Sequence, residues 1–371
     1  MNTPSSPSNA GTTPNPPAPF GAASDGTTVE QVTLRNAQGW TCTLLTHGAR
    51  VRSLHVPDRD GRLGNVVLGF DHLAVYEGDG SSFGATCGRV AGRIAKGKYT
   101  LDGTPRELDA HDSQGNHRHG GKVGFMLRHW DVEDATEDRC TLALVSEDGD
   151  QRYPGRLVTR VTYTLEDDAL RIDYRAETDA PTPVNLTNHS YFNLGGVPDG
   201  ASADQLRTQT FETLVRLDCD EYLECVDMIP TGERTAVQGT PLDFRTPRTI
   251  GERIADLTEG PRPGYDHALQ VRGHDGALRE TARCAHPPTG RSMTVLSDQP
   301  CLVFYSTNLK PEAPPFQGSG GAQFGPRSAF CIEMQKQPDA INRQDDPHFA
   351  DVIVRPGTPY TQTTIYRFAV E

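Results

Sequence analysis

Two hydrophobic stretches carry side chains that can bind or transfer protons, and the first of them holds His189. NLTNHSYFNLGG (185–196) alternates apolar residues with Asn, Thr, His and Tyr. At the period of a strand, the face that can pack on a core carries Val184, Leu186, Asn188, Ser190, Phe192 and Leu194. The opposite face carries Asn185, Thr187, His189, Tyr191 and Asn193, which suits binding of a neutral, hydroxyl-rich ligand. A hydrogen-bonded His in a partly buried sheet is the alternative interpretation.

Glu333 occupies the second such stretch, AFCIEMQ (329–335). Phe330, Ile332 and Met334 form its apolar face, and Glu333 points the other way among small or polar neighbours. A lone carboxylate on so hydrophobic a strand is costly to desolvate unless it is paired or used. Burial raises a carboxyl pKa toward the range of a useful base. A structural ion pair is the alternative.

Two arginines stand among small residues in GRVAGRIAKG (88–97). Read as a strand, this stretch places Arg89 and Arg93 on one side, with room around each guanidinium. An Arg fork can bind hydroxyl groups or lock a carboxylate. A solvated surface charge is the alternative for either residue.

Three shorter motifs add polar groups of less certain meaning. NHRHGG (116–121) spaces His117 and His119 as two metal ligands on a strand would be, but its glycines favour a loop and no third ligand is signalled nearby. We therefore expect no metal site, and we expect His119 to contact a ligand by hydrogen bonding. In GYDH (264–267), Asp266 beside an aromatic residue can hold vicinal hydroxyls. Gln299 stands at the entrance of the mixed strand SDQPCLVFYSTN (297–308).

The elements that position these side chains are predicted to be mainly antiparallel strands in packed sheets. RLVTRVTYTL (156–165) pairs plausibly with the alternating run around 170–176 through the turn EDDA. The 37 Gly and 28 Pro favour many short elements joined by turns. The best short helix candidate is TIGERIADL (249–257), in which Thr249 and Glu252 fit a capping box.

Domain organisation follows from composition. Residues 1–27 are rich in Pro, Ser, Thr, Asn and Gly, which predicts a disordered tail, with folded structure beginning near Val29. Residues 28–371 are predicted to form a single β domain, which is long enough to bury a sizeable core.

Charge and cysteine usage exclude several classes of partner. The net charge of −13 argues against nucleic acid, an anionic membrane or polyphosphate as a bulk partner. Eight scattered cysteines without a C-x-x-C pair indicate buried or free thiols, not a disulfide framework. No run approaches a membrane span, and the N-terminus lacks the regions of a secretory signal. A cytoplasmic location is therefore expected.

Taken together, seven blocks of the sequence resemble the aldose 1-epimerase (galactose mutarotase) family. They occur in the family's order and extend over roughly residues 30–371: FGATCGRVAGRIAKGKYTLDG, NHRHGG, YPG, VNLTNHSYFNLGG, GYDH, SDQP and AFCIEMQ. No single block is decisive, but the ordered set, with NHSYFNLGG at its centre, is highly specific.

The resemblance implies an antiparallel β-supersandwich with few short helices and a sugar bound on a concave sheet surface. It implies that His189 is the general acid and Glu333 the general base, and that the sugar is held by Arg93, His119, Asp266 and Gln299. The family often has Asn immediately before this Arg, whereas this chain has Gly92. That departure leaves the acid and base untouched but makes the sugar preference less certain. His117 has no counterpart role.

The implied activity is that of an isomerase: interconversion of the α and β anomers of free aldohexoses such as galactose and glucose by acid/base ring opening. No cofactor is required. An unperturbed His is only roughly a quarter protonated at pH 7. We therefore expect a nearby acidic group, Glu333 or Asp266, to favour the imidazolium form of His189.

Three alternatives remain at this point. A hexose-6-phosphate 1-epimerase would need a basic cluster near the sugar, for which Lys96, Lys98 and Lys122 are candidates, although the acidic balance disfavours it. A non-catalytic sugar-binding protein would need neither an acid nor a base. A metal enzyme would use the pair His117 and His119. The expected partner is a small monosaccharide, with neither nucleic acid nor membrane, and the chain is expected to be a monomer or weak dimer.

Overall fold

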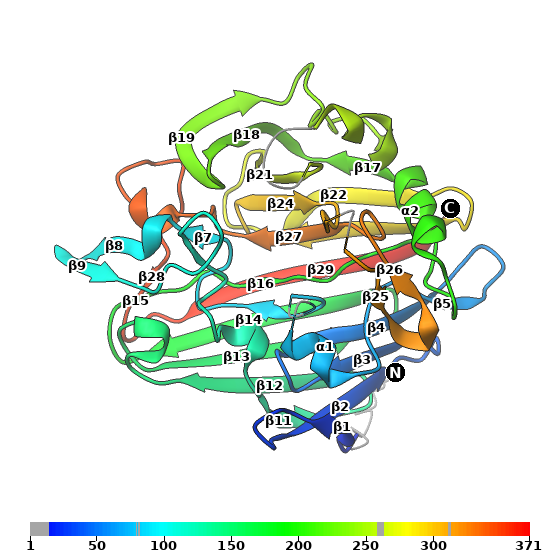
Figure 1. Ribbon diagram of the computed structural model, residues 1–371, viewed down its shortest axis with the longest axis horizontal. Helices are drawn as coiled ribbons and strands as arrows, with labels where there is room; N and C mark the ends of the chain where they lie inside the picture. Colours follow the sequence, from blue (N-terminus) through cyan, green and yellow to red (C-terminus); the bar gives the residue numbers. More distant parts are fainter. Residues whose placement is uncertain (1–14, 79, 81, 258–262, 311–312) are drawn as a thin grey trace, which may run out of the picture.

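The computed structural model describes residues 15–78, 80, 82–257, 263–310 and 313–371, and strands dominate this part of the chain (Figure 1). It contains two α-helices, α1 (Leu73–Glu77) and α2 (Ala203–Glu212). Its short 3-10 turns are η1 (Ala95–Gly97), η2 (Phe125–Leu127), η3 (Asp150–Arg152), η4 (Ile250–Glu252), η5 (Ile254–Asp256), η6 (Ser319–Gly321) and η7 (Ala340–Asn342).

Nine strands form the largest sheet, and every neighbouring pair in it is antiparallel. In spatial order they are β11 (Asp131–Ala135), β12 (Arg139–Ser146), β13 (Leu157–Leu165), β14 (Ala169–Thr178), β29 (Tyr360–Val370), β23 (Arg291–Ser297), β22 (Arg279–His286), β17 (Leu214–Leu217) and β20 (Arg248–Thr249). The predicted pairing around the turn EDDA is confirmed, because Leu165 lies opposite Leu170 where β13 meets β14.

Two five-stranded antiparallel sheets form the second layer. The first consists of β1 (Ala18–Ala22), β2 (Thr28–Arg35), β3 (Thr41–Leu45), β4 (Arg50–Pro57) and β5 (Leu63–Asn65). The second runs in the order β19 (Ile229–Ala236), β18 (Cys219–Val226), β21 (Asp266–Val271), β24 (Cys301–Tyr305) and β27 (Cys331–Gln335).

Short antiparallel pairs complete the description of the strands. These are β6 (Thr86–Cys87) with β16 (Thr187–Asn188), β7 (Arg93–Ile94) with β10 (His117–Arg118), β8 (Lys98–Leu101) with β9 (Thr104–Glu107), β15 (Thr182–Pro183) with β28 (Ile353–Val354), and β25 (Phe316–Gln317) with β26 (Gln323–Phe324).

One continuous core joins the layers. Its buried side chains come from all three large sheets, for example Val32 of β2, Val161 of β13 and Leu302 of β24. The second five-stranded sheet meets the large one directly, since the hydroxyl of Tyr366 on β29 donates to the carbonyl of Ile332 on β27. Apolar faces buried between antiparallel sheets make a sandwich, and the predicted fold class is confirmed.

The segment 185–196 lies in the seam between the two five-stranded sheets. Phe192 forms an isolated bridge with Val67, which follows β5, and a second bridge with Phe330, which precedes β27. On the β27 side, Lys336 donates its backbone N–H to Asn185 Oδ1 at 2.8 Å, and Asn185 returns a bond to the carbonyl of Lys336 at 3.0 Å. The segment therefore acts as a shared strand, although only β16 within it is regular.

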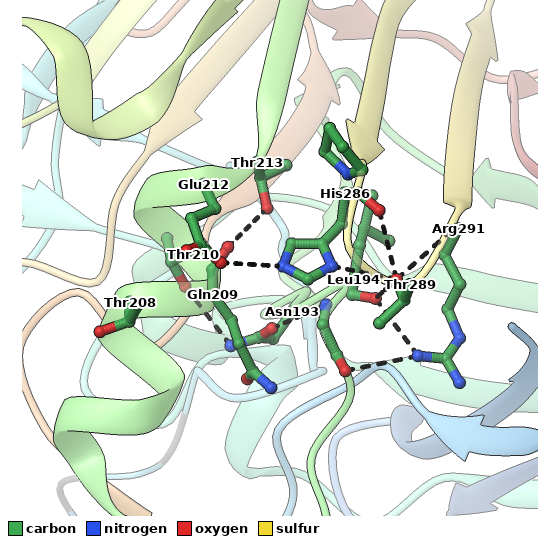
Figure 2. A network of polar contacts seen from close by, with 12 residues as sticks. Asn193, Leu194, Thr208, Gln209, Thr210, Glu212, Thr213, His286, Thr289 and Arg291 are labelled. Carbon is green, nitrogen blue, oxygen red and sulfur yellow. Dashed lines mark hydrogen bonds and ion pairs between the residues drawn. The ribbon is translucent and has the colours of Figure 1, made fainter. Parts of the chain in front are cut away.

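The far end of this segment is fixed by a buried arginine (Figure 2). Arg291 is 4% exposed and donates to the carbonyls of Leu194 and Gly195, each at 3.4 Å. Thr289 donates to the same Leu194 carbonyl at 3.0 Å and meets Nδ1 of His286 at 3.0 Å. A side chain on Gly195 would collide with Gln209, because an added Cβ would lie 2.6 Å from its Cγ and Cδ. Gly195 thus makes room for the side chain of Gln209.

The expectations for the N-terminal tail and for the helix candidate were wrong. Residues 18–22 lie inside the predicted tail, yet they form β1, because they pair with the free edge of β2 and Phe20 packs on buried aromatic residues. Residues 1–14 of that tail lie outside the described residues. TIGERIADL is not an α-helix: Thr249 belongs to β20 and makes no capping bond, and the chain then forms η4 and η5. Pairing of β20 with β17 holds Thr249 extended.

The state of the cysteines and the lengths of the helices match what the sequence indicated. All eight cysteines are free, and all but Cys225 are buried. Within the described ranges, no helix is both long and apolar enough to cross a membrane.

Candidate active site

The register of the second five-stranded sheet places the predicted polar residues on one face. Glu333 lies opposite Val303, which lies opposite Ala268, and Asp266 lies opposite Tyr305. Side chains two residues apart on a strand share a face, so Glu333 and Asp266 point to the same side of the sheet. The other face of β27, with Phe330, Ile332 and Met334, packs in the core as predicted.

His189 and Glu333 meet at the edge of this face. Nε2 of His189 lies 3.5 Å from Oε1 of Glu333, and the two side chains are only 8% and 5% exposed. His189 is held from the backbone, since its N–H donates to the carbonyl of Ala85 and its carbonyl accepts from Gly84, both at 2.9 Å. The seam thus brings the imidazole of one segment to the carboxyl of another strand.

The protonation of this pair differs from the prediction. Burial and the nearby Arg118 lower the pKa of His189 to about 3. Burial, reinforced by Asp266, raises the pKa of Glu333 well above its usual range, although Arg93 opposes the rise. The expectation that an acidic neighbour favours the imidazolium was therefore wrong. Desolvation disfavours the charged form of both side chains.

His119 stands beside His189 with its tautomer fixed. Their ring centroids are 5.8 Å apart in an edge-to-face arrangement. Nδ1 of the His119 ring accepts the backbone N–H of Gly92 at 3.3 Å. The backbone N–H of His119 donates to the Gly92 carbonyl at 2.9 Å. Burial sets the pKa of His119 well below its usual range, so the ring is neutral. Its proton is then on Nε2, which can donate to a ligand.

Arg93 reaches the site, but Arg89 does not. Nε of Arg93 donates to Oδ2 of Asp112 at 2.9 Å, with the side chains 17% and 5% exposed. Arg89 is buried elsewhere and donates to the carbonyls of Ser146 at 2.8 Å and Pro154 at 2.9 Å. The predicted continuous strand over 88–97 was wrong, because the backbone bends at Arg89 and at 91–92, where Gly92 has φ +72°.

Gln299 lies at the edge of this constellation. Gln299 is buried, and its Nε2 donates to Asp298 at 2.8 Å. It precedes Val303 by four residues, an even spacing that corresponds to the same face of the sheet. Its Oε1 is buried without a hydrogen-bond partner among the described residues. The structure therefore brings together His189, Glu333, His119, Asp266 and Arg93, and it leaves Gln299 at the end of the face away from Asp266.

Several predicted side chains serve the scaffold. His117 is buried, with Nδ1 2.9 Å from the carbonyl of Asp109 and Nε2 2.8 Å from the hydroxyl of Tyr153. Asn193 donates to the carbonyls of Leu206 at 3.0 Å and Ser328 at 2.9 Å. In the part of the chain that the structure describes, no three His, Cys, Asp or Glu side chains are grouped to hold a metal ion.

Sequence reasoning gave no individual role to three residues around His189. Tyr191 stacks on its ring, Tyr305 meets it edge to face, and Arg118 acts on its pKa. The alternation of 185–194 already placed Tyr191 on the side of His189, and Arg118 stands between the two histidines of NHRHGG. Tyr305 carried no signal, because its place depends on the pairing of β24 with β21 and β27.

Comparison with known proteins finds relatives over most of this chain. Residues 30–367 match the aldose 1-epimerase family. Galactose mutarotase of Bos taurus is 38% identical over 353 residues, covering 95% of this chain and 96% of that protein. Aldose 1-epimerase of Escherichia coli (strain K12) is 35% identical over 353 residues, covering 94% and 98%.

Solved structures show the same architecture. The crystal structure of the GalM/aldose epimerase homologue from C. elegans matches with a TM-score of 0.81 at 29% identity, covering 92% of this chain and 99% of that one. Galactose 1-epimerase from Lactobacillus acidophilus NCFM gives a TM-score of 0.77 at 23% identity, covering 96% and 98%. The latter likeness concerns the fold alone.

Proposed function

The chain belongs to the aldose 1-epimerase family and interconverts anomers of aldoses, and we propose that His189 is the general acid and Glu333 the general base of this isomerisation. One observation carries the proposal: Nε2 and Oε1 of two almost fully buried side chains lie 3.5 Å apart. A proton donor and a proton acceptor at one place are what opening a sugar ring requires.

In the proposed cycle, the carboxylate of Glu333 takes the proton of the C1 hydroxyl while the imidazolium of His189 protonates the ring oxygen. The electron pair of the O–H bond forms the C1 carbonyl, and the bond from C1 to the ring oxygen breaks. Rotation about C1–C2 presents the other face of the resulting aldehyde. The reverse transfers close the ring as the other anomer, so protons and electrons balance without a further reactant.

The pKa directions support this assignment of roles. A lowered pKa makes the His189 imidazolium a stronger acid, and a raised pKa makes the Glu333 carboxylate a stronger base. Ring opening converts the ionised pair into neutral His189 and protonated Glu333. Burial lowers the pKa of His189 and raises that of Glu333, so it favours the forms of both groups that ring opening leaves.

We further propose that four polar side chains hold the sugar hydroxyls. Nε2–H of His119 is available to donate, and Arg93 offers its remaining guanidinium donors. The half-buried carboxylate of Asp266 can accept from hydroxyls. The buried Oε1 of Gln299, which has no hydrogen-bond partner among the described residues, can accept from another hydroxyl.

The substrates proposed are free aldohexoses such as galactose and glucose. Relatives named galactose mutarotase support a hexose, and the net charge of −13 disfavours phosphorylated sugars. Initial rates with galactose, glucose, xylose, arabinose and the two hexose 6-phosphates would rank them. Faster turnover of the 6-phosphates would overturn this substrate class. A monomer or weak dimer and a cytoplasmic location also remain predictions.

The acid and base are tested by His189→Asn and Glu333→Gln, followed by polarimetry of a freshly dissolved anomer. Each variant should lose roughly 10²- to 10⁴-fold in kcat, because each removes one proton-transfer partner. The exposed variants His72→Asn and Glu137→Gln are matched controls and should retain full activity. Near-normal kcat in a folded His189→Asn or Glu333→Gln protein would remove that residue from the mechanism.

A further inference from the structure

His189 is the last ring of an aromatic stack. The rings of Phe83 and Tyr191 lie 3.9 Å apart with 5° between their planes, and those of Tyr191 and His189 lie 4.9 Å apart at 11°. Phe83 and Tyr191 are 1% and 3% exposed. The imidazole therefore lies nearly parallel to a buried tyrosine ring that is itself supported from behind.

The stack is fixed at its sides as well as at its end. Tyr305 stands edge to face against His189 at 5.9 Å and 84°, and against Tyr191 at 6.1 Å and 87°. The Tyr191 hydroxyl lies 3.0 Å from the hydroxyl of Ser82. Behind it, Phe83 packs on Phe70 at 4.9 Å. The Tyr191 ring is enclosed by these aromatic neighbours, and such close packing restricts it to one orientation.

The groups around His189 have opposite effects on the stability of its imidazolium form. Arg118 of β10 and the neutral His119 offer the imidazolium no stabilisation, and burial removes its water. Glu333 faces it from β27. The ring face of Tyr191 carries the negative side of an aromatic quadrupole, which attracts a flat cation lying on it.

We propose that Tyr191 is a positioning residue for His189: the Phe83–Tyr191–His189 stack fixes the imidazole plane, directs Nε2 toward Glu333 and stabilises the imidazolium that donates the proton. The inference rests on the proposed role of His189 as general acid. Tyr191 itself acts through His189 and is not assigned a contact with the sugar.

The test compares Tyr191→Phe with Tyr191→Leu in the full chain. Tyr191→Phe keeps the stacked ring and should keep most of the activity. Tyr191→Leu removes the ring and should lower kcat by roughly 2- to 30-fold, the loss of a buried cation–π contact. KM for galactose should stay within about twofold of its original value, because the residues proposed to hold the sugar remain.

A double-mutant cycle separates this role from general damage. In the His189→Asn background, Tyr191→Leu should have no further effect on kcat. The enzyme concentration is chosen so that the catalysed rate exceeds the rate of spontaneous mutarotation. Equal loss in both backgrounds, or equal damage from Tyr191→Phe and Tyr191→Leu, would overturn the proposal. So would unchanged kcat in Tyr191→Leu.

Failure of the proposed function would look different, since His189→Asn alone would then remain active. If Tyr191→Leu does not fold, Phe83→Leu loosens the same stack from behind. It should lower kcat in the presence of His189 and leave the His189→Asn background unchanged. No dependence on His189 in that cycle would equally reject the proposal.

Discussion

Arg93 and Asp112 form a nearly buried ion pair, with Nε of the arginine 2.9 Å from Oδ2 of the aspartate. The other carboxylate oxygen of Asp112 accepts the backbone N–H groups of Asn116 at 2.7 Å and Gln114 at 3.0 Å. The loop before β10 thus holds a carboxylate in place, and the carboxylate orients a guanidinium that is proposed to bind the sugar.

Asp112→Asn should weaken sugar binding more than it slows the chemistry. Without the carboxylate, Arg93 loses the partner that orients it, which should raise KM for galactose by roughly 3- to 10-fold and change kcat by less than about threefold. Initial-rate polarimetry over a range of galactose concentrations measures both. Asp60→Asn, in an exposed Arg–Asp pair with Arg62, is the matched control. An unchanged KM in Asp112→Asn would contradict the expected role.

Gly92→Asn should change sugar preference at a small cost in stability. An added Cβ would lie 3.2 Å from Cβ of Pro338 and 3.4 Å from Nε2 of Gln335, and asparagine tolerates the φ of +72° better than most residues. We expect the free energy of unfolding to fall by about 0.5–1 kcal/mol. The ratio of kcat/KM for galactose and glucose should change several-fold, because the new amide enters beside Arg93.

Gly103→Asn is the control for backbone strain alone. Its φ is +76°, and an added Cβ there meets nothing within 4 Å. It should cost about as much stability as Gly92→Asn while leaving the galactose-to-glucose ratio unchanged. The same ratio in both variants would show that position 92 does not influence selectivity.

Acid should destabilise the fold well above the pH at which carboxylates titrate. Burial is the main cause that lowers the pKa of His47 and His117 to about 4 and that of His189 to about 3. In the unfolded chain they titrate near 6.5. Between pH about 6.5 and about 4 the unfolded state therefore binds more protons, and stability falls as the pH falls. Burial raises the pKa of the carboxyls of Glu333, Asp298 and Asp339, and these groups work in the opposite direction. The histidines whose pKa burial lowers outnumber them, since His55, His119, His267, His274 and His286 also belong to that set.

Thermal unfolding followed by circular dichroism checks this expectation. The Tm should be roughly 3–10 °C lower at pH 5 than at pH 7. His117→Asn should flatten this dependence, whereas the exposed His72→Asn should leave it unchanged. A Tm that rises on acidification to pH 5 would refute the assigned directions.

Arg291→Leu should weaken the anchor of the NLGG segment. The guanidinium serves the carbonyls of Leu194, Gly195, Val56 and Arg62, which would lose a buried charged donor. We expect the free energy of unfolding to fall by about 2–4 kcal/mol. Urea denaturation measures it. Arg62→Leu, at a 78% exposed side chain, should cost less than about 0.5 kcal/mol, and equal costs would argue against the anchor.

The alternation of apolar and polar residues predicted much of the candidate site. It separated His189 and Glu333 from the core residues beside them, and the structure places these two side chains in contact. Period two works here because a one-residue shift would move a buried face into the opposite layer. The pairing of β13 with β14 was predictable for the same reason.

Other features were not predictable from the sequence pattern. The pattern put Arg89 with Arg93, but the positive φ of Gly92 separates them. The mechanism implied by the resemblance needed an imidazolium at His189, but burial and Arg118 lower the pKa of this side chain. Residues 18–22 of the predicted tail form β1 because they pair with the edge of β2. Amino-acid composition alone does not predict this pairing. Only the effect of Arg118 on His189 comes from a neighbour remote in the chain. The other two outcomes depend on local backbone geometry at Gly92 and on pairing with the next strand.

The position of the segment 185–196 ties the proposed acid and base to assembly of the second layer. Phe192 bridges toward both five-stranded sheets, and His189, three residues before Phe192, meets Glu333. Mutarotation by the proposed pair would therefore report complete folding of this layer. A chain divided into two fragments would regain activity only when the complementary halves close on their shared strand.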